Sequence, residues 1–83
     1  MLKNKVVIIT GGAGRLGSAI SKSIIEHGGC VVLVDTNVKS LNLLKAELGS
    51  DLCLALNIDA GNEEGANLVI EKAILKFGRI DSV

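Results

Sequence analysis

Three short apolar runs, separated by segments with helical spacing, constrain the fold of this chain more than any other feature. They cover residues 6–9, 30–34 and 52–58, and the first is entirely β-branched. Continuous apolar runs of this length are typical of strands buried on both faces, as in parallel sheets. Roughly 20 residues separate one run from the next, which suits a helical crossover and is too long for a hairpin. We therefore predict parallel strands joined by helices.

The connecting segments carry apolar residues at the spacing of amphipathic helices. Glycines at Gly28, Gly29, Gly49 and Gly78 are suited to end these helices, and Asn62 is suited to cap the start of the third. The stripes expected to be buried are Leu16, Ala19, Ile20, Ser23 and Ile24 in the first helix, Val38, Leu41, Leu44 and Leu48 in the second, and Ala66, Ile70, Ala73, Ile74 and Phe77 in the third.

The resulting order of elements is β-α-β-α-β-α, and residues 80–83 have the character of a fourth strand that has just begun. Because crossovers between parallel strands are right-handed, the helices pack over a parallel sheet. This is an α/β fold, half of a doubly wound Rossmann fold, with strand order 3-2-1 and a truncated fourth strand beside the first. We predict a single unit over residues 1–83, an incomplete N-terminal dinucleotide-binding portion from which the catalytic half is absent.

Composition excludes several classes of partner. The 83 residues carry nine basic and nine acidic side chains, so no bulk charge attracts nucleic acid or an acidic membrane surface. The chain has one Phe and no Tyr or Trp, which leaves no aromatic platform for bases. The longest apolar stretches without a polar residue, 30–34 and 52–56, have five residues, whereas a spanning helix needs about 20. We therefore expect no nucleic-acid partner and no membrane association.

The two cysteines and the single histidine have simple structural interpretations. Cys30 and Cys53 begin or lie within apolar runs, and no secretory signal precedes them, so we expect reduced, buried thiols and a cytoplasmic location. His27 lies at the end of the first helix, where a contact with the negative end of the helix dipole explains it better than catalysis.

A glycine-rich segment follows the first predicted strand. Gly12, Gly14 and Gly17 fit G-x-G-x-x-G, while Gly11, Gly14 and Gly17 fit T-G-x-x-G-x-x-G. Glycine tolerates the tight turn and lets a pyrophosphate approach the backbone, and the N–H groups at the start of the next helix face the anion. Gly17 would let the helix pack closely on the strand. The alternative is a tight turn without a ligand, but a strand before the loop and a helix after it are the context that dinucleotide binding requires.

An acidic residue, Asp35, ends the second predicted strand. Its carboxylate can accept hydrogen bonds from the adenosine ribose hydroxyls and would repel a 2′-phosphate, which favours NAD over NADP. The alternative role for Asp35 is to cap the next helix. Arg15 leaves the choice of cofactor open, because it can reach a 2′-phosphate or the pyrophosphate, or point to solvent.

At this point the sequence resembles the short-chain dehydrogenase/reductase family over its whole length. The segments that carry the resemblance are VVIITGGAGRLGSAI at 6–20, VVLVDTN at 31–37, NIDAGNEE at 57–64 and FGRIDSV at 77–83. They occur in the family's order and spacing, and together they are far more specific than any one of them.

The resemblance implies a role for each matching residue. Gly11, Gly14 and Gly17 would form the phosphate loop, and the backbone at Arg15 and Leu16 would face the pyrophosphate. Asp35 would bind the adenosine ribose. Asp59 would accept a hydrogen bond from the adenine amino group, with Ala60 beside the ring, although a helix-capping carboxylate is the alternative for Asp59.

One departure from the family pattern leaves the reaction class open. The commonest family loop, T-G-x-x-x-G-x-G, would place a glycine at Arg15, whereas here it stands at Gly14, as in many nucleotide-sugar epimerases and dehydratases. The segments at 57–64 and 77–83 are more similar to ordinary short-chain oxidoreductases, which transfer hydride between a nicotinamide cofactor and a hydroxyl or carbonyl substrate. A non-enzymatic dinucleotide-binding module is the third hypothesis.

The family's catalytic residues have no counterpart in this chain. Short-chain dehydrogenases use a Tyr as general acid and base and a Lys four positions later, and the 83 residues contain no Tyr. We therefore expect the chain to be the cofactor-binding part of a longer enzyme, and we expect that enzyme to be a homo-oligomer. A first strand with an open apolar edge also predicts self-association of this chain.

Overall fold

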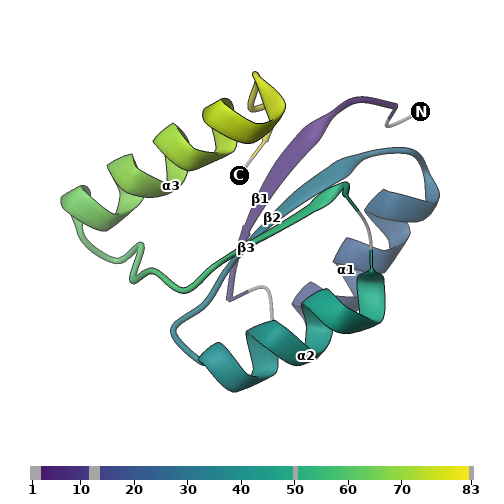
Figure 1. The fold of residues 1–83 in the computed structure, drawn as a ribbon, viewed down its shortest axis with the longest axis horizontal. Coiled ribbons are helices and arrows are strands. Elements are labelled where there is room, and N and C mark those ends of the chain that lie inside the picture. The colour runs from purple at the N-terminus through teal and green to yellow at the C-terminus, as the bar shows by residue number, and fades with distance from the viewer. Residues whose placement is uncertain (1–2, 12–13, 50, 83) are drawn as a thin grey trace.

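The computed structural model describes residues 3–11, 14–49 and 51–82. Within these ranges, three strands alternate with three helices. Figure 1 shows their arrangement. The elements are β1 (Val6–Thr10), α1 (Arg15–Glu26), β2 (Cys30–Val34), α2 (Val38–Leu48), β3 (Cys53–Leu56) and α3 (Glu63–Phe77). The predicted α/β order is confirmed.

The strands form one parallel sheet with β2 in the middle. Ile8 in β1 lies opposite Val32 in β2, which in turn lies opposite Leu54 in β3. The strand order is therefore the predicted 3-2-1. β3 is shorter than the predicted run 52–58, because the chain leaves the sheet at Asn57, whose side-chain amide donates to the carbonyl of Asp35 at 3.0 Å.

Helices cover both faces of the sheet, with α1 and α2 on one side and α3 on the other (Figure 1). The central strand alternates between them. Val31 and Leu33 pack with Ile24 of α1 and with Leu41 and Leu44 of α2. Its other side chains, Cys30, Val32 and Val34, pack toward Val69 and Ala73 of α3. All five residues of β2 are buried, so this strand is the centre of both apolar cores.

The capping residues of α2 and α3 mark where these two helices begin and end. Asn37 and Asn62 cap α2 and α3 by accepting hydrogen bonds from the backbone N–H groups of Ser40 and Gly65. Gly49 and Gly78 end the same two helices in the left-handed conformation, as predicted. The cap expected at Asn62 is therefore confirmed.

The predicted buried faces of α1 and α3 are partly wrong. Gly17, Ser21 and Ile24 are the buried residues of α1, while Leu16 is 75% exposed and Ile20 41% exposed. In α3 the buried residues are Gly65, Val69 and Ala73, while Ile70 and Ile74 are exposed. Ile24 and Ala73 are buried as predicted, whereas Ala19 and Ser23 are exposed. The unpredicted buried positions include Gly17, Ser21 and Gly65, whose small size permits a close approach of helix and strand. In α2 the prediction holds for Leu41 and Leu44 but not for Val38, which is exposed.

Residues 80–82 lie along the outer edge of β1. Ser82 forms a parallel bridge with Val7, and its carbonyl accepts the N–H of Ile8 at 2.9 Å. Asp81 donates its own N–H to the carbonyl of Val6 at 2.8 Å. The described part of this segment is thus placed as the predicted beginning of a fourth strand, and Val83 lies outside the described residues.

The Asp81 carboxylate links this segment to β1 through a hydrogen bond. It accepts hydrogen bonds from Arg79 Nε at 2.9 Å and from the Val6 N–H at 2.8 Å. The bond from Arg79, and next the bond from Val6, lower the pKa of Asp81 below its ordinary value. A carboxylate whose pKa is lower in the folded state than in the unfolded state stabilises the fold at neutral pH. That contribution is lost as the pH falls through the lowered pKa.

We therefore expect Asp81→Asn to melt at a lower temperature than the wild type at pH 7. The two melting temperatures should converge as the pH falls from about 4 through the lowered pKa, below which the aspartate is also neutral. Circular dichroism melts across this range measure the difference, with the exposed Asp51→Asn as the control. A difference that stays constant down to about pH 2 would contradict the assignment.

Candidate functional site

Gly11 directly follows β1, at the start of the predicted glycine loop. Gly11 has a φ of 65°, a left-handed conformation that side chains rarely adopt, and donates its N–H to the carbonyl of Val34 at 2.8 Å. Gly12, on which the alternative G-x-G-x-x-G motif depends, lies outside the described residues together with Ala13. Gly14 lies directly before α1, and its N–H donates a hydrogen bond to the carbonyl of Gly11 at 3.2 Å.

The first turn of α1 differs from those of the other two helices. Asn37 and Asn62 cap α2 and α3, whereas no described side chain caps α1 and no acidic residue lies in its first turn. Arg15 and Leu16 are exposed there. The N–H groups at a helix start need partners, and their dipoles favour an anion. A phosphate group fits this helix end.

Gly17 lies on the opposite side of the same turn. It is buried, and its carbonyl accepts the Ser21 hydroxyl at 2.7 Å. Together with Ser21 and Ile24 it forms the face that α1 turns to the sheet. This position agrees with the packing role expected of the last glycine of the motif.

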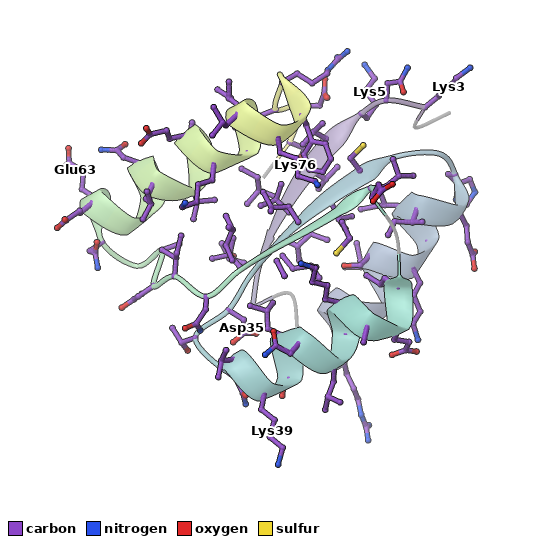
Figure 2. All side chains as sticks on the ribbon, in the orientation of Figure 1. Lys3, Lys5, Asp35, Lys39, Glu63 and Lys76 are labelled. Carbon is purple, nitrogen blue, oxygen red and sulfur yellow. The ribbon has the colours of Figure 1, made fainter. Side chains whose placement is uncertain are left out.

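Asp35 directly follows β2 and is half-buried. Its Oδ1 accepts the N–H of Asn37 at 3.0 Å, and Asn37 itself caps α2. The capping role considered for Asp35 therefore belongs to Asn37. Figure 2 shows Asp35 near the beginning of α2, at the end of the sheet where the strands finish.

Asp59 and Ala60 lie in the loop between β3 and α3. The Asp59 Oδ1 accepts the N–H of Gly61 at 2.9 Å, which closes a tight turn. The helix that follows is capped by Asn62 rather than by Asp59. Asp59 is exposed and Ala60 is half-buried.

A cavity of about 200 Å³ brings several of these residues together at the carboxyl ends of the strands. Gly11, Asp35, Asp59 and Ala60, all singled out from the sequence, line it. Ligands of open parallel sheets bind in this position, where loops from neighbouring strands meet. The remaining lining residues are Thr10, Val34, Thr36 and Ile58. Gly14, Arg15, Leu16 and Gly17 do not line the cavity and belong to the adjacent start of α1.

Two features of the site were not predicted from the sequence. Thr10 is the last residue of β1, and Thr36 is the second residue after β2. Both line the cavity, and their positions next to Gly11 and Asp35 were the available signal. Asn57 bonds to the carbonyl of Asp35 and thereby joins the loops after β2 and β3. No local pattern indicates this contact, because the two residues are far apart in the chain.

The remaining candidate groups lie elsewhere. Cys30 and Cys53 are unpaired and buried, and burial raises the pKa of both thiols, which agrees with a packing role. His27 ends α1, and its Nδ1 contacts the carbonyl of Ser23 at 2.7 Å, as its expected structural role implies. Within the described ranges no cluster of potential metal ligands occurs. No helix among them has the length and apolarity to cross a bilayer.

Known proteins share both the sequence pattern and the fold. Post-translational flagellin modification protein A of Campylobacter coli is 36% identical over 84 residues, which cover 98% of this chain and 33% of that protein. The chain thus spans about a third or less of the length of the curated relatives that it matches.

Two crystal structures from Brucella melitensis superpose closely. One is a short-chain dehydrogenase/reductase of the glucose/ribitol dehydrogenase type, with a TM-score of 0.90 and 30% identity over 96% of this chain and 34% of the other. The second is a 3-ketoacyl-(acyl-carrier-protein) reductase in complex with NADH, with a TM-score of 0.90 and 31% identity over 98% of this chain and 33% of the other. The model of the short chain dehydrogenase family matches residues 5–83. The chain therefore belongs to the short chain dehydrogenase family.

Proposed function

We propose that this chain is the cofactor-binding part of an NAD-dependent short-chain oxidoreductase. The observation that supports the proposal best is the cavity lined by Gly11, Asp35, Asp59 and Ala60, next to the start of α1, which no described side chain caps. A dinucleotide has a pyrophosphate, a ribose and an adenine, and these residues supply a partner for each. The nicotinamide of the bound cofactor would supply the hydride chemistry.

The residues of the chain would hold the cofactor as follows. The N–H groups at Arg15 and Leu16 would donate to the pyrophosphate, and Gly11 would keep the turn before them open. Asp35 would accept from the ribose hydroxyls, and Asp59 from the adenine amino group. The substrate would be a hydroxyl or carbonyl compound bound by parts of the protein outside these 83 residues. A cytoplasmic location and an assembly of several copies of the complete enzyme stay predictions.

The choice of NAD over NADP depends on Asp35. Its carboxylate is half-buried at the cavity, where the negative charge of a 2′-phosphate would be repelled. Titration of the chain with NADH and NADPH, followed by cofactor fluorescence or calorimetry, measures both dissociation constants. We expect the smaller Kd for NADH. A smaller Kd for NADPH would contradict the proposed cofactor, and no binding of either would contradict the proposed function.

The family match favours this function over a nucleotide-sugar epimerase or dehydratase, because the model that matches is that of the short chain dehydrogenases. The epimerase hypothesis was based on the position of Gly14 alone. A module that binds a dinucleotide without catalysis would have the same binding behaviour. Reduction of NAD by the complete enzyme in the presence of hydroxyl substrates distinguishes the two.

We also propose that this chain associates with itself through the outer edge of β1. Among the described residues, 80–82 pair with the first half of the strand. Apolar hollows flank the edge on both faces of the sheet. One of about 270 Å³ is lined by Ile9 and Ile20, among others, and one of about 150 Å³ by Ile8 and Ile70, among others. Unpaired strand edges with apolar surroundings are templates for association.

Analytical ultracentrifugation of the chain at concentrations of tens of micromolar should therefore detect dimers or larger species. Ile20→Lys and Ile70→Lys should each shift the distribution toward the monomer, because a charge would then have to be buried in a hollow. Leu43→Lys is the matched control, since Leu43 is 66% exposed on α2 and lines neither hollow. A wild-type chain that stays monomeric across the concentration range would refute self-association.

A further inference from the structure

The first turn of α3 lies against the segment that forms one wall of the cavity. Asp59 and Ala60 line the cavity, and α3 begins only three residues after Ala60, at Glu63 (Figure 1). Gly65 is buried in that first turn. A Cβ built on Gly65 would overlap the carbonyl oxygen of Asp59 and would lie 3.0 Å from its carbonyl carbon. The backbone of Asp59 therefore occupies the space that any side chain at position 65 would need.

Backbone conformation does not explain a glycine at this position. Gly65 is helical and is not among the glycines with positive φ, so every residue type could adopt its dihedral angles. Glycine is also a poor helix former. The close approach of Asp59 is the feature of its surroundings that requires the absence of a side chain.

Two hydrogen bonds hold this contact from either side. Asn62 Oδ1 accepts the N–H of Gly65 at 2.7 Å, and Asp59 Oδ1 accepts the N–H of Gly61 at 2.9 Å. The same Asn62 oxygen would lie 3.3 Å from a Cβ at Gly65. The turn, the cap and the glycine therefore form one continuous unit from Asp59 to the first turn of α3.

The helix cannot easily withdraw to make room for a side chain. Val69 and Ala73, one and two turns after Gly65, are 3% and 0% exposed and belong to the apolar core on this face of the sheet. Interiors of this kind resist displacement because they are closely packed. A larger residue at position 65 would thus displace the less buried loop, which carries Asp59 and Ala60.

We propose that Gly65 is a positioning residue for the adenine side of the cavity, acting through the backbone of Asp59. This inference rests on the proposed function, because it assigns Asp59 to the adenine. Gly65 itself does not line the cavity. Because Gly65 has no side chain, α3 can pack directly against the backbone of Asp59. This packing holds the loop where the Asp59 carboxylate can accept a hydrogen bond from the ligand.

A double-mutant cycle tests the proposal with the full chain. The variants are Gly65→Ala, Asp59→Ala and the two combined, and the measurements are the Kd values for NAD and for AMP by calorimetry. Gly65→Ala should weaken the binding of both ligands about tenfold, the size expected when a charge-assisted hydrogen bond is lost. In the Asp59→Ala background it should have almost no further effect, because residues that act through one contact are not additive.

Controls separate positioning from helix propensity and from folding. Asn67→Ala is exposed on the same helix, raises helix propensity in a similar way and should leave both Kd values unchanged. Gly61→Ala puts a Cβ 3.0 Å from Asp59 Oδ1 at an exposed position, so it should also weaken binding. This variant serves as the test if Gly65→Ala does not fold. The amide ¹H–¹⁵N shifts of Ala60 and Gly61 should move in Gly65→Ala and not in Asn67→Ala.

The outcomes are distinguishable. Unchanged shifts at Ala60 and Gly61 in a folded Gly65→Ala would overturn the inference even if the wild type bound no cofactor. Wild-type binding of NAD with additive effects of Gly65→Ala and Asp59→Ala would also overturn it and leave the proposed function intact. Absence of NAD and AMP binding by the wild type, with the shifts moved as expected, would refute the proposed function while leaving the contact between Gly65 and Asp59 supported.

Discussion

Asp35→Ala should weaken the binding of NAD by about 10- to 100-fold, because hydrogen bonds to a charged group contribute about 1.5–3 kcal/mol. The carboxylate lies at the cavity, half-buried at the end of β2, where the proposed ribose hydroxyls would donate to it. The same substitution removes a negative charge that opposes a 2′-phosphate. The ratio of the Kd for NADP to the Kd for NAD should therefore fall, and calorimetric titrations with both cofactors measure it.

Asp35→Asn separates the charge of this residue from its structural contact. Asp35 Oδ1 accepts the N–H of Asn37 before α2, and an asparagine can keep this bond while losing the charge. We expect Asp35→Asn to retain the melting temperature of the wild type and still to bind NAD more weakly. Asp51→Ala, which removes an exposed aspartate that does not line the cavity, is the matched control. Equal NAD affinities in the wild type and Asp35→Ala would exclude Asp35 from the site.

Strands and their order could be predicted because the signals are local and strong. The apolar runs at β1 and β2 have a length and a β-branched composition that suit a buried parallel strand, and the spacing between them admits only a crossover. Asn62 and Gly78 set the limits of α3 through their own side-chain or backbone chemistry. Gly11 and Asp35 could be located because each directly follows a strand, and parallel strands end at the same edge of the sheet.

Packing orientation could not be predicted in the same way. The apolar stripe through Leu16 and Ile20 has good helical spacing, yet α1 docks through Gly17 and Ser21. Helical periodicity finds the more apolar face, whereas close docking on a sheet selects the smaller one. The role proposed for Gly65 could not be predicted either, because it depends on close packing against the carbonyl of Asp59, six residues earlier, and not on any motif.

Leu33→Ala should destabilise the chain by about 3 kcal/mol, within the range of 2–5 kcal/mol for leucine-to-alanine changes in a core. Leu33 is 0% exposed in the central strand and packs with Ile24, Leu41 and Leu44 of the two helices on one face. Truncation leaves a cavity between three elements that cannot all close on it. Small domains have a stability of only about 0.05–0.15 kcal/mol per residue, so this loss is a large share of the total for 83 residues.

Urea unfolding followed by circular dichroism measures the loss, with Leu43→Ala as the matched control. Leu43 is 66% exposed on α2, so the same chemical change there should alter stability by less than about 0.5 kcal/mol. Equal midpoints for Leu33→Ala and Leu43→Ala would contradict the placement of β2 at the centre of the core. Leu33 does not line the cavity, so saturating NAD should stabilise the folded state of Leu33→Ala by the same increment as the wild type. A smaller increment would mean that the core between α1, α2 and the sheet also maintains the shape of the cofactor cavity.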